Sequence, residues 1–227
     1  MYILVLLLLL LAIVIGPGIW VQRVMSRYSE PADRYQGTGA ELARHLLDQL
    51  KLNDVQVELT DRGDHYDPEK KVVRLSDQHF NSASLTAITV AAHEVGHAMQ
   101  DQDNYAPLIW RGRLVRLAGP LQKLAAAIMF AAPVLTVITR TPVTGVAMFA
   151  AGFLFLVLMP LLHLVTLPVE LDASFGRALP MLTRGGFLQR GDEPYARKIL
   201  TAAACTYVAA SLISLINVGR WWAILRS

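Results

Sequence analysis

The sequence predicts an α+β membrane protein, with about four transmembrane helices and a small polar domain. Three observations predict this class. Hydrophobic residues make up 54% of the 227 residues and charged residues only 17%, against about 45–50% and about 25% in soluble proteins. The apolar residues gather in four stretches, each too long for a strand. Residues 30–106, in contrast, carry polar helix and strand patterns.

The N-terminal residues 1–21 are predicted to form a transmembrane anchor. The run holds about 20 apolar residues, enough to cross a hydrocarbon core of about 30 Å. A cleaved signal peptide is the alternative, and it is disfavoured because no Lys or Arg precedes the run and no small-x-small cleavage site follows it.

The remaining apolar stretches predict a helical hairpin and a last span. Arg140 and Pro142 interrupt the apolar sequence and mark the turn of the hairpin. The predicted segments are the hairpin 123–168 with its spans 124–139 and 143–168, a loop segment 169–198, the fourth span 199–218 and a short tail 219–227.

Charge predicts the orientation of these spans. Four spans leave 22–122 and 169–198 on one side of the bilayer, and both are rich in Lys and Arg. The positive-inside rule therefore places both in the cytoplasm. Residues 107–118 mix Trp and Leu with three arginines and predict an interfacial amphipathic helix, with an ordinary charged loop as the alternative.

Composition also excludes some partners. The net charge of +3 is modest and no basic run alternates with aromatic residues, so we expect the lipid bilayer as a partner but no nucleic acid. The single cysteine, Cys205, excludes an intrachain disulfide and a Cys-x-x-Cys metal site.

Residues 22–122 are predicted to form the polar domain, with one helix, two strands and a second helix in order. Residues 37–50 carry leucines at helical spacing, and 55–59 and 72–76 read as strands. The turn formers between the strands predict a hairpin with a long turn. The second helix begins after a cap at Asn81, Ser82 or Ser84 and runs to about Gln100.

That second helix contains an HExxH motif, formed by His93, Glu94 and His97. Residues four apart share a helix face, so both imidazoles can bind one zinc ion. Glu94 can then act as general base on a zinc-activated water and later protonate the leaving amine. The motif predicts a zinc metallopeptidase that hydrolyses peptide bonds of a peptide or protein substrate. A surface helix with two solvated histidines is the alternative.

A catalytic zinc ion needs a third protein ligand. Glu170 and Asp172 are the candidates, because acidic residues beside a membrane span are costly unless they have a function or a partner. Both are predicted to lie on the same side of the membrane as the motif. An ion pair with Arg177 is the alternative. A donor to the oxyanion could come from His65, Tyr66 or His79, although turn or surface roles are favoured, and strand 72–76 could be an edge that pairs with a substrate.

Three stretches, AAHEVGHAMQ, GDHYDP before VVRLS, and LPVELDASFGRAL, together resemble the bacterial membrane neutral zinc metallopeptidase family. The resemblance covers nearly the whole chain. It implies a zincin-like (gluzincin) domain in the bacterial cytoplasmic membrane, and one zinc ion held by His93, His97 and Glu170 with Glu94 as base. The sequence is more distantly similar to CAAX prenyl proteases and heat-shock membrane proteases, and Ser174 stands where their ExxAD pattern has Asp.

Two other hypotheses stay open. The chain could be a non-catalytic, zinc-stabilised membrane scaffold or adaptor, which a fourth ligand among His65, His79 and Asp172 would favour. It could also be an intramembrane protease with the motif inside a span. The polar flanks leave only about 17 residues for such a span, which is at the short limit.

Overall fold

The computed structural model describes residues 2–206 and 209, with side chains for residues 12, 15–121, 123–153, 165–206 and 209. The chain divides into two compact units: the first comprises 1–16, 109–166 and 207–227, and the second 17–108 and 167–206. The elements are α1 (Tyr2–Arg27), α2 (Gly39–Gln49), β1 (Gln56–Thr60), β2 (His65–Asp67), β3 (Val72–Ser76), α3 (Asp77–Phe80), α4 (Leu85–Gln102), α5 (Ala106–Thr139), α6 (Pro142–Leu171), the π-helix η1 (Asp172–Ala178) and α7 (Leu179–Arg184). The predicted mixture of helices with a small sheet is confirmed.

Helix α2 confirms the helix predicted over 37–50. A capping box starts it: the Thr38 hydroxyl accepts from the Glu41 amide, and the Glu41 carboxylate accepts from the Thr38 amide. Its leucines at helical spacing are buried against α4. A side chain at Gly39 would collide with the His79 carbonyl, so the start of α2 lies directly against α3.

The three-stranded sheet has the order β1-β3-β2, and this corrects two expectations. The predicted hairpin between 55–59 and 72–76 is wrong, because β1 and β3 pair in parallel. The stretch taken for a long turn contains β2, which pairs antiparallel with β3. Strands β2 and β3 therefore form the hairpin, and the turn between them begins at Asp67. The Asp67 carboxylate accepts hydrogen bonds from the Glu69 and Lys70 amides. Strand β3 is therefore central and is not an edge for a substrate.

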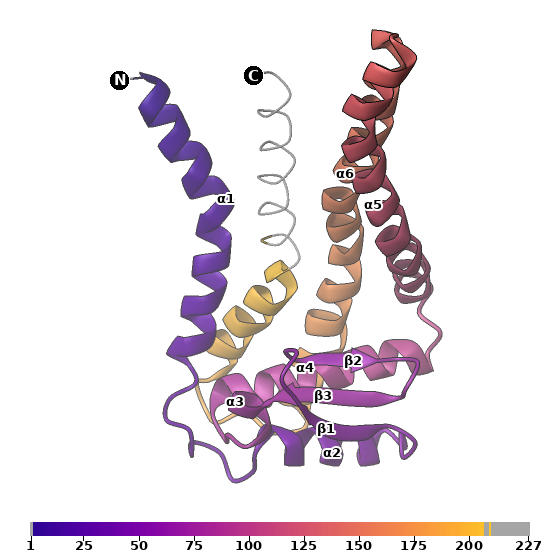
Figure 1. The fold of residues 1–227 in the computed structure, drawn as a ribbon. Helices are drawn as coiled ribbons and strands as arrows, with labels where there is room; N and C mark the ends of the chain where they lie inside the picture. Colours follow the sequence, from indigo (N-terminus) through magenta and orange to yellow (C-terminus); the bar gives the residue numbers. More distant parts are fainter. Residues whose placement is uncertain (1, 207–208, 210–227) are drawn as a thin grey trace. The chain divides into compact units, whose positions relative to one another are not determined.

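Helix α4 begins with Ser84 as N-cap, its hydroxyl accepting from the Ala87 amide. The helix is buried along almost its whole length, between α2, α3, the sheet and η1. Figure 1 shows it running beside the sheet. This burial matches its apolar sequence and excludes a surface helix with solvated histidines. The four-residue helix α3 was not predicted.

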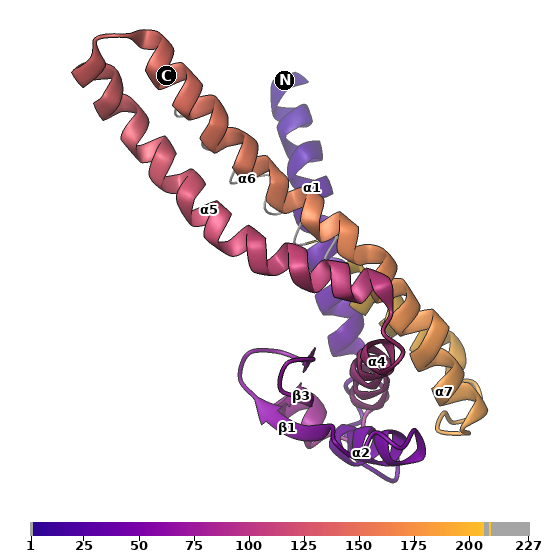
Figure 2. The same ribbon diagram turned by 90° about the vertical axis from the view of Figure 1, so that its right-hand side faces the viewer.

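The first unit contains the predicted helical hairpin. Helix α5 ends at Thr139, α6 begins at Pro142, and Arg140 between them has a φ of 51°. The two helices run side by side (Figure 2). A side chain at Gly152 would collide with Met129, so the helices touch there. Residues 107–118 are helical and run directly into the rest of α5, as expected for a helix that leads into the second predicted span, and their interfacial position stays a prediction.

Among the residues that the structure describes, one helix is long and apolar enough to cross a membrane, Ala106–Thr139, and the first part of α6 with described side chains, Pro142–Phe153, is a shorter apolar stretch. Residues 193–206 are helical, and most of the rest of the predicted span 199–218 lies outside the described residues. The side chains at 2–11 and 154–164 also lie outside them. All four spans therefore stay predictions, and α5 is the one candidate span among the described residues. Helix α4 is not among the helices that could cross a membrane, in keeping with its polar flanks.

Candidate metal centre

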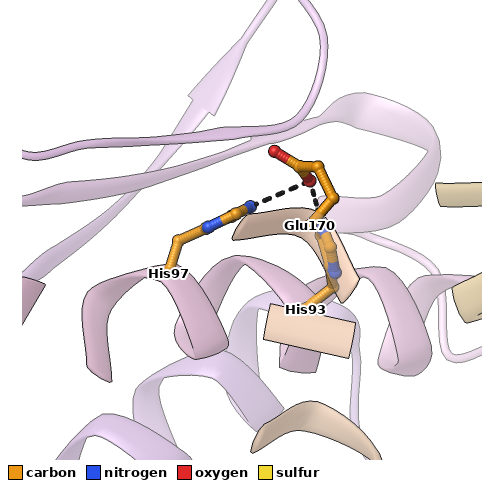
Figure 3. Close-up of side chains that lie close together, drawn as sticks. All are labelled: His93, His97 and Glu170. Atoms are coloured by element: carbon orange, nitrogen blue, oxygen red, sulfur yellow. Dashed lines mark hydrogen bonds and ion pairs between the residues drawn. The ribbon is translucent and has the colours of Figure 1, made fainter. Parts of the chain in front are cut away.

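Helix α4 and the last turn of α6 bring His93, His97 and Glu170 together, from positions more than seventy residues apart in the chain. Glu170 Oε2 lies 3.2 Å from His93 Nε2 and 3.3 Å from His97 Nε2. All three side chains are buried, and Glu170 is only 1% exposed. The two imidazoles rise from successive turns of α4 toward the carboxylate (Figure 3). These three groups could hold a metal ion.

The second nitrogen of each imidazole, Nδ1, has a hydrogen-bond partner on the side away from Glu170. His93 Nδ1 lies 3.0 Å from the Ser174 hydroxyl, and that hydroxyl donates to the Leu200 carbonyl. Because a serine has one hydroxyl proton, Ser174 accepts from His93 Nδ1–H. His97 Nδ1 lies 2.9 Å from Gln100 Oε1. Both rings therefore turn Nε2 toward the centre, which is the arrangement that outer hydrogen bonds impose on metal-binding histidines.

Close packing of α4 on η1 positions the carboxylate. A Cβ at Gly96 would lie 2.7 Å from the Ala173 carbonyl, so only glycine fits between the two histidines at this approach. The π-helix η1 begins two residues after Glu170. Such wide turns are uncommon and occur often at functional sites. Here the wide turn directs Glu170 and Ser174 to the histidines and Asp172 to Gln100.

The electrostatics of the site favour an ionised Glu170. Burial alone would raise the pKa of this carboxyl group. The charge and hydrogen bonds of His97 and His93 outweigh burial and hold its pKa below its ordinary value. A buried carboxylate facing two imidazoles needs positive charge at their centre, supplied by protons or by a cation.

The other predicted residues lie as follows. Glu94 is buried on α4, 6% exposed, next to His93. Asp172, the second candidate for the third ligand, is directed away and accepts from Gln100 and Arg177. The ion pair predicted as the alternative role for an acid here is thus formed by Asp172 with Arg177, at 2.9 Å.

The remaining candidates have partners outside the cluster. His79 pairs with Asp64 at 2.7 Å, and His65 Nδ1 lies 2.8 Å from the Gly63 carbonyl. The Tyr66 hydroxyl donates to Asp101. His65 lies at the start of β2, but His79 is buried and Tyr66 is half-buried against the core, so the turn or surface roles favoured from the sequence do not hold for these two residues.

Sequence reasoning missed the roles of Gln100 and Ser174. Both had a signal. Gln100 is a polar residue in an apolar helix, three residues after His97, where it shares a helix face with that histidine. Ser174 follows Glu170 by four residues, so in a helix a hydroxyl there lies on the side that carries this carboxylate.

A buried His-His-Glu set built on an HExxH helix is the donor arrangement of the zinc peptidases. The chain belongs to a family of that class, described as "Putative neutral zinc metallopeptidase", whose profile matches residues 1–226. The chain is also 38% identical over 214 residues to the "Putative membrane protease YugP" of Bacillus subtilis (strain 168), covering 91% of each chain. No solved structure matches the chain.

Proposed function

We propose that this chain is a membrane-embedded, zinc-dependent endopeptidase with a gluzincin-type site that faces the cytoplasm. One observation carries the proposal: His93 Nε2, His97 Nε2 and Glu170 Oε2 converge within 4.8 Å of one another, while each imidazole Nδ1 is held by another residue. Family membership and the name of the Bacillus subtilis relative support the reaction class and the membrane setting.

The donor set suits zinc. Two imidazole nitrogens and one carboxylate oxygen are the protein ligands of many catalytic zinc sites, which keep a further position for water. A zinc ion bound here would supply Lewis acidity, polarising the scissile carbonyl and lowering the pKa of water to about 7. His93, His97 and Glu170 would hold the ion, and the buried surroundings would strengthen each electrostatic interaction.

Glu94 is the proposed general base. It adjoins His93 on α4 and is buried at 6% exposure. Its carboxylate would take the proton from the attacking water and return it to the nitrogen of the leaving amine. The net reaction consumes one water and yields a carboxylate and an amine from one peptide bond.

The scaffold hypothesis finds less support. A structural zinc site is closed by four protein ligands. Among the described side chains, the candidate metal cluster consists of three residues, His93, His97 and Glu170. The candidates for a fourth, His65, His79 and Asp172, have their contacts elsewhere. A three-ligand site favours catalysis.

The decisive test is Glu94→Gln in the detergent-purified chain, with release of new amino termini from an unfolded protein substrate as the readout. We expect about a 10²–10⁴-fold loss of rate, as for removal of a general base, with zinc still bound. Glu58→Gln, at an exposed carboxylate on the sheet, is the matched control and should cleave normally. Cleavage by the Glu94→Gln enzyme at the wild-type rate would exclude the mechanism.

Orientation in the membrane can be tested separately. A cysteine placed at Gln102, in a Cys205→Ala background, should react with a membrane-impermeant thiol reagent in inside-out vesicles, because the site is proposed to face the cytoplasm. Protection of that cysteine would instead support a motif within the bilayer.

A further inference from the structure

We propose that Gln100 is a positioning residue of the metal centre, whose amide sets the tautomer of His97 and joins the helix that carries HExxH to the segment that carries Glu170. The inference rests on the proposed function, since it takes His97 and Glu170 to be zinc ligands. Gln100 is a neutral residue outside the HExxH motif, so the motif alone does not identify this role.

Gln100 makes three hydrogen bonds from a completely buried position. Its Nε2 donates to the Val169 carbonyl and to Asp172 Oδ2, each at 2.8 Å. Its Oε1 lies 2.9 Å from His97 Nδ1. Both amide protons and the amide oxygen are thereby used, so the side-chain amide of Gln100 is fixed by partners on every polar atom.

These partners decide the orientation of the amide. The Val169 carbonyl is only an acceptor, and Asp172 Oδ2 already accepts from Arg177 Nε at 2.9 Å. Two acceptors must face the –NH₂ group, so the amide oxygen must face His97. His97 Nδ1 therefore carries a proton, and Nε2, the nitrogen that points at Glu170, is the one available to a metal.

The same amide also holds the third ligand in place. Val169 immediately precedes Glu170, and Asp172 follows it by two residues. Gln100 thus bonds the chain on both sides of the carboxylate that must meet the histidines. Arg177 extends the connection, because it binds Asp172 and also Asp103 at the end of α4. Loss of the Gln100 amide should therefore have two effects: the ring of His97 becomes free to rotate, and the position of Glu170 becomes less fixed.

The test compares Gln100→Met with Gln102→Met in the full-length, detergent-purified chain. Met keeps the volume of Gln but makes none of the three hydrogen bonds, and Gln102 is an exposed residue of the same helix, so its variant controls for the substitution. Zinc affinity, measured by competition with a chromophoric chelator, should fall about 10–100-fold for Gln100→Met, as for loss of other outer partners of metal ligands. It should not change for Gln102→Met.

Histidine tautomers give a second readout that does not need bound zinc. In metal-free protein with ¹⁵N-labelled histidine, we expect the His97 signals to report a proton on Nδ1 in the wild type and to change in Gln100→Met. Gln100→Glu should keep the acceptor for His97, and hence its tautomer, but lose zinc affinity because it cannot donate to Val169 and Asp172. This variant also keeps the test informative if Gln100→Met does not fold.

Wild-type zinc affinity in Gln100→Met, together with an unchanged His97 tautomer, would overturn the inference and leave the proposed function intact. Absence of zinc from the wild-type protein, even after zinc is supplied, would instead overturn the proposed function. In that case the tautomer measurement on metal-free protein would still decide whether Gln100 orients His97.

Discussion

Gly96 and the backbone carbonyl of Ala173 occupy adjoining space, so that a Cβ on Gly96 would lie 2.7 Å from that oxygen. Gly96 lies between the two histidines of the motif, and Ala173 lies three residues beyond Glu170. The contact therefore joins the two segments that supply the candidate metal ligands. A backbone oxygen cannot rotate away as a side chain can, so any larger residue must separate the segments.

Gly96→Ala is predicted to weaken zinc binding by about tenfold or more, since small displacements of functional groups at an assembled site have effects of this size. Ala also favours a helix over Gly by about 1 kcal/mol, which offsets part of the cost of separating the segments, so we expect a smaller effect on the thermal stability of the metal-free protein than on zinc binding. Zinc titration and thermal unfolding would separate these effects. Gly112→Ala, in α5 with open space around it, is the control and should bind zinc like the wild type. Tight zinc binding by Gly96→Ala would show that the contact is unimportant.

Glu170→Ala is predicted to abolish stoichiometric zinc binding, because two imidazoles alone make a poor site. Mass spectrometry of the purified protein should find about one zinc per wild-type chain and little in the variant. Removing zinc from the wild type with a chelator should lower its melting temperature, because a ligand that binds the folded state stabilises it. The variant should not respond to the chelator. Full zinc occupancy in Glu170→Ala would move the third ligand elsewhere, with Asp172 the first residue to test.

Ser174→Ala is predicted to weaken zinc binding about 10–100-fold, the usual effect of losing the hydrogen-bond partner of a metal-bound histidine. The variant leaves His93 Nδ1 without the hydroxyl that accepts from it. Thr89→Val is the matched control, because it removes another buried hydroxyl of the second unit, one bonded to the Leu85 carbonyl. Equal zinc affinities for the two variants would mean that Ser174 contributes only to packing.

The Asp64–His79 pair predicts acid sensitivity of the fold. Burial would raise the pKa of Asp64, but the hydrogen bond and charge of His79 and the donors of Ser76 outweigh it and hold that pKa below its ordinary value. A carboxyl group whose pKa is lower in the folded than in the unfolded chain stabilises the fold above the unfolded value of about 3.9. This contribution is lost as the pH falls through the folded pKa.

Metal-free wild type should therefore melt at a higher temperature than Asp64→Asn at neutral pH, with the gap narrowing below about pH 4. Using metal-free protein keeps zinc release out of the comparison. A gap that stays constant from neutral to acid pH would show that the charge of Asp64 does not stabilise the fold.

The sequence was most informative where the relevant interactions are local. The helical spacing in 37–50 predicted α2, and the four-residue interval between His93 and His97 predicted their shared helix face. Strand pairing could not be predicted in the same way. Alternation along 55–59 and 72–76 identifies strands, but their neighbours depend on where the chain between them passes, and β2 within that stretch made the pairing parallel.

By itself, the sequence determined the chemistry available to this protein: two histidines and a glutamate at fixed helical spacing, and two acidic candidates for a third ligand. The tertiary structure brings Glu170 to the histidines and directs Asp172 to Gln100, because Gly96 packs against Ala173 and η1 forms a wide turn. It also revealed Gln100 and Ser174 behind the two imidazoles. Helical periodicity relates residues a turn apart, whereas contacts between segments more than seventy residues apart exist only after the chain has packed.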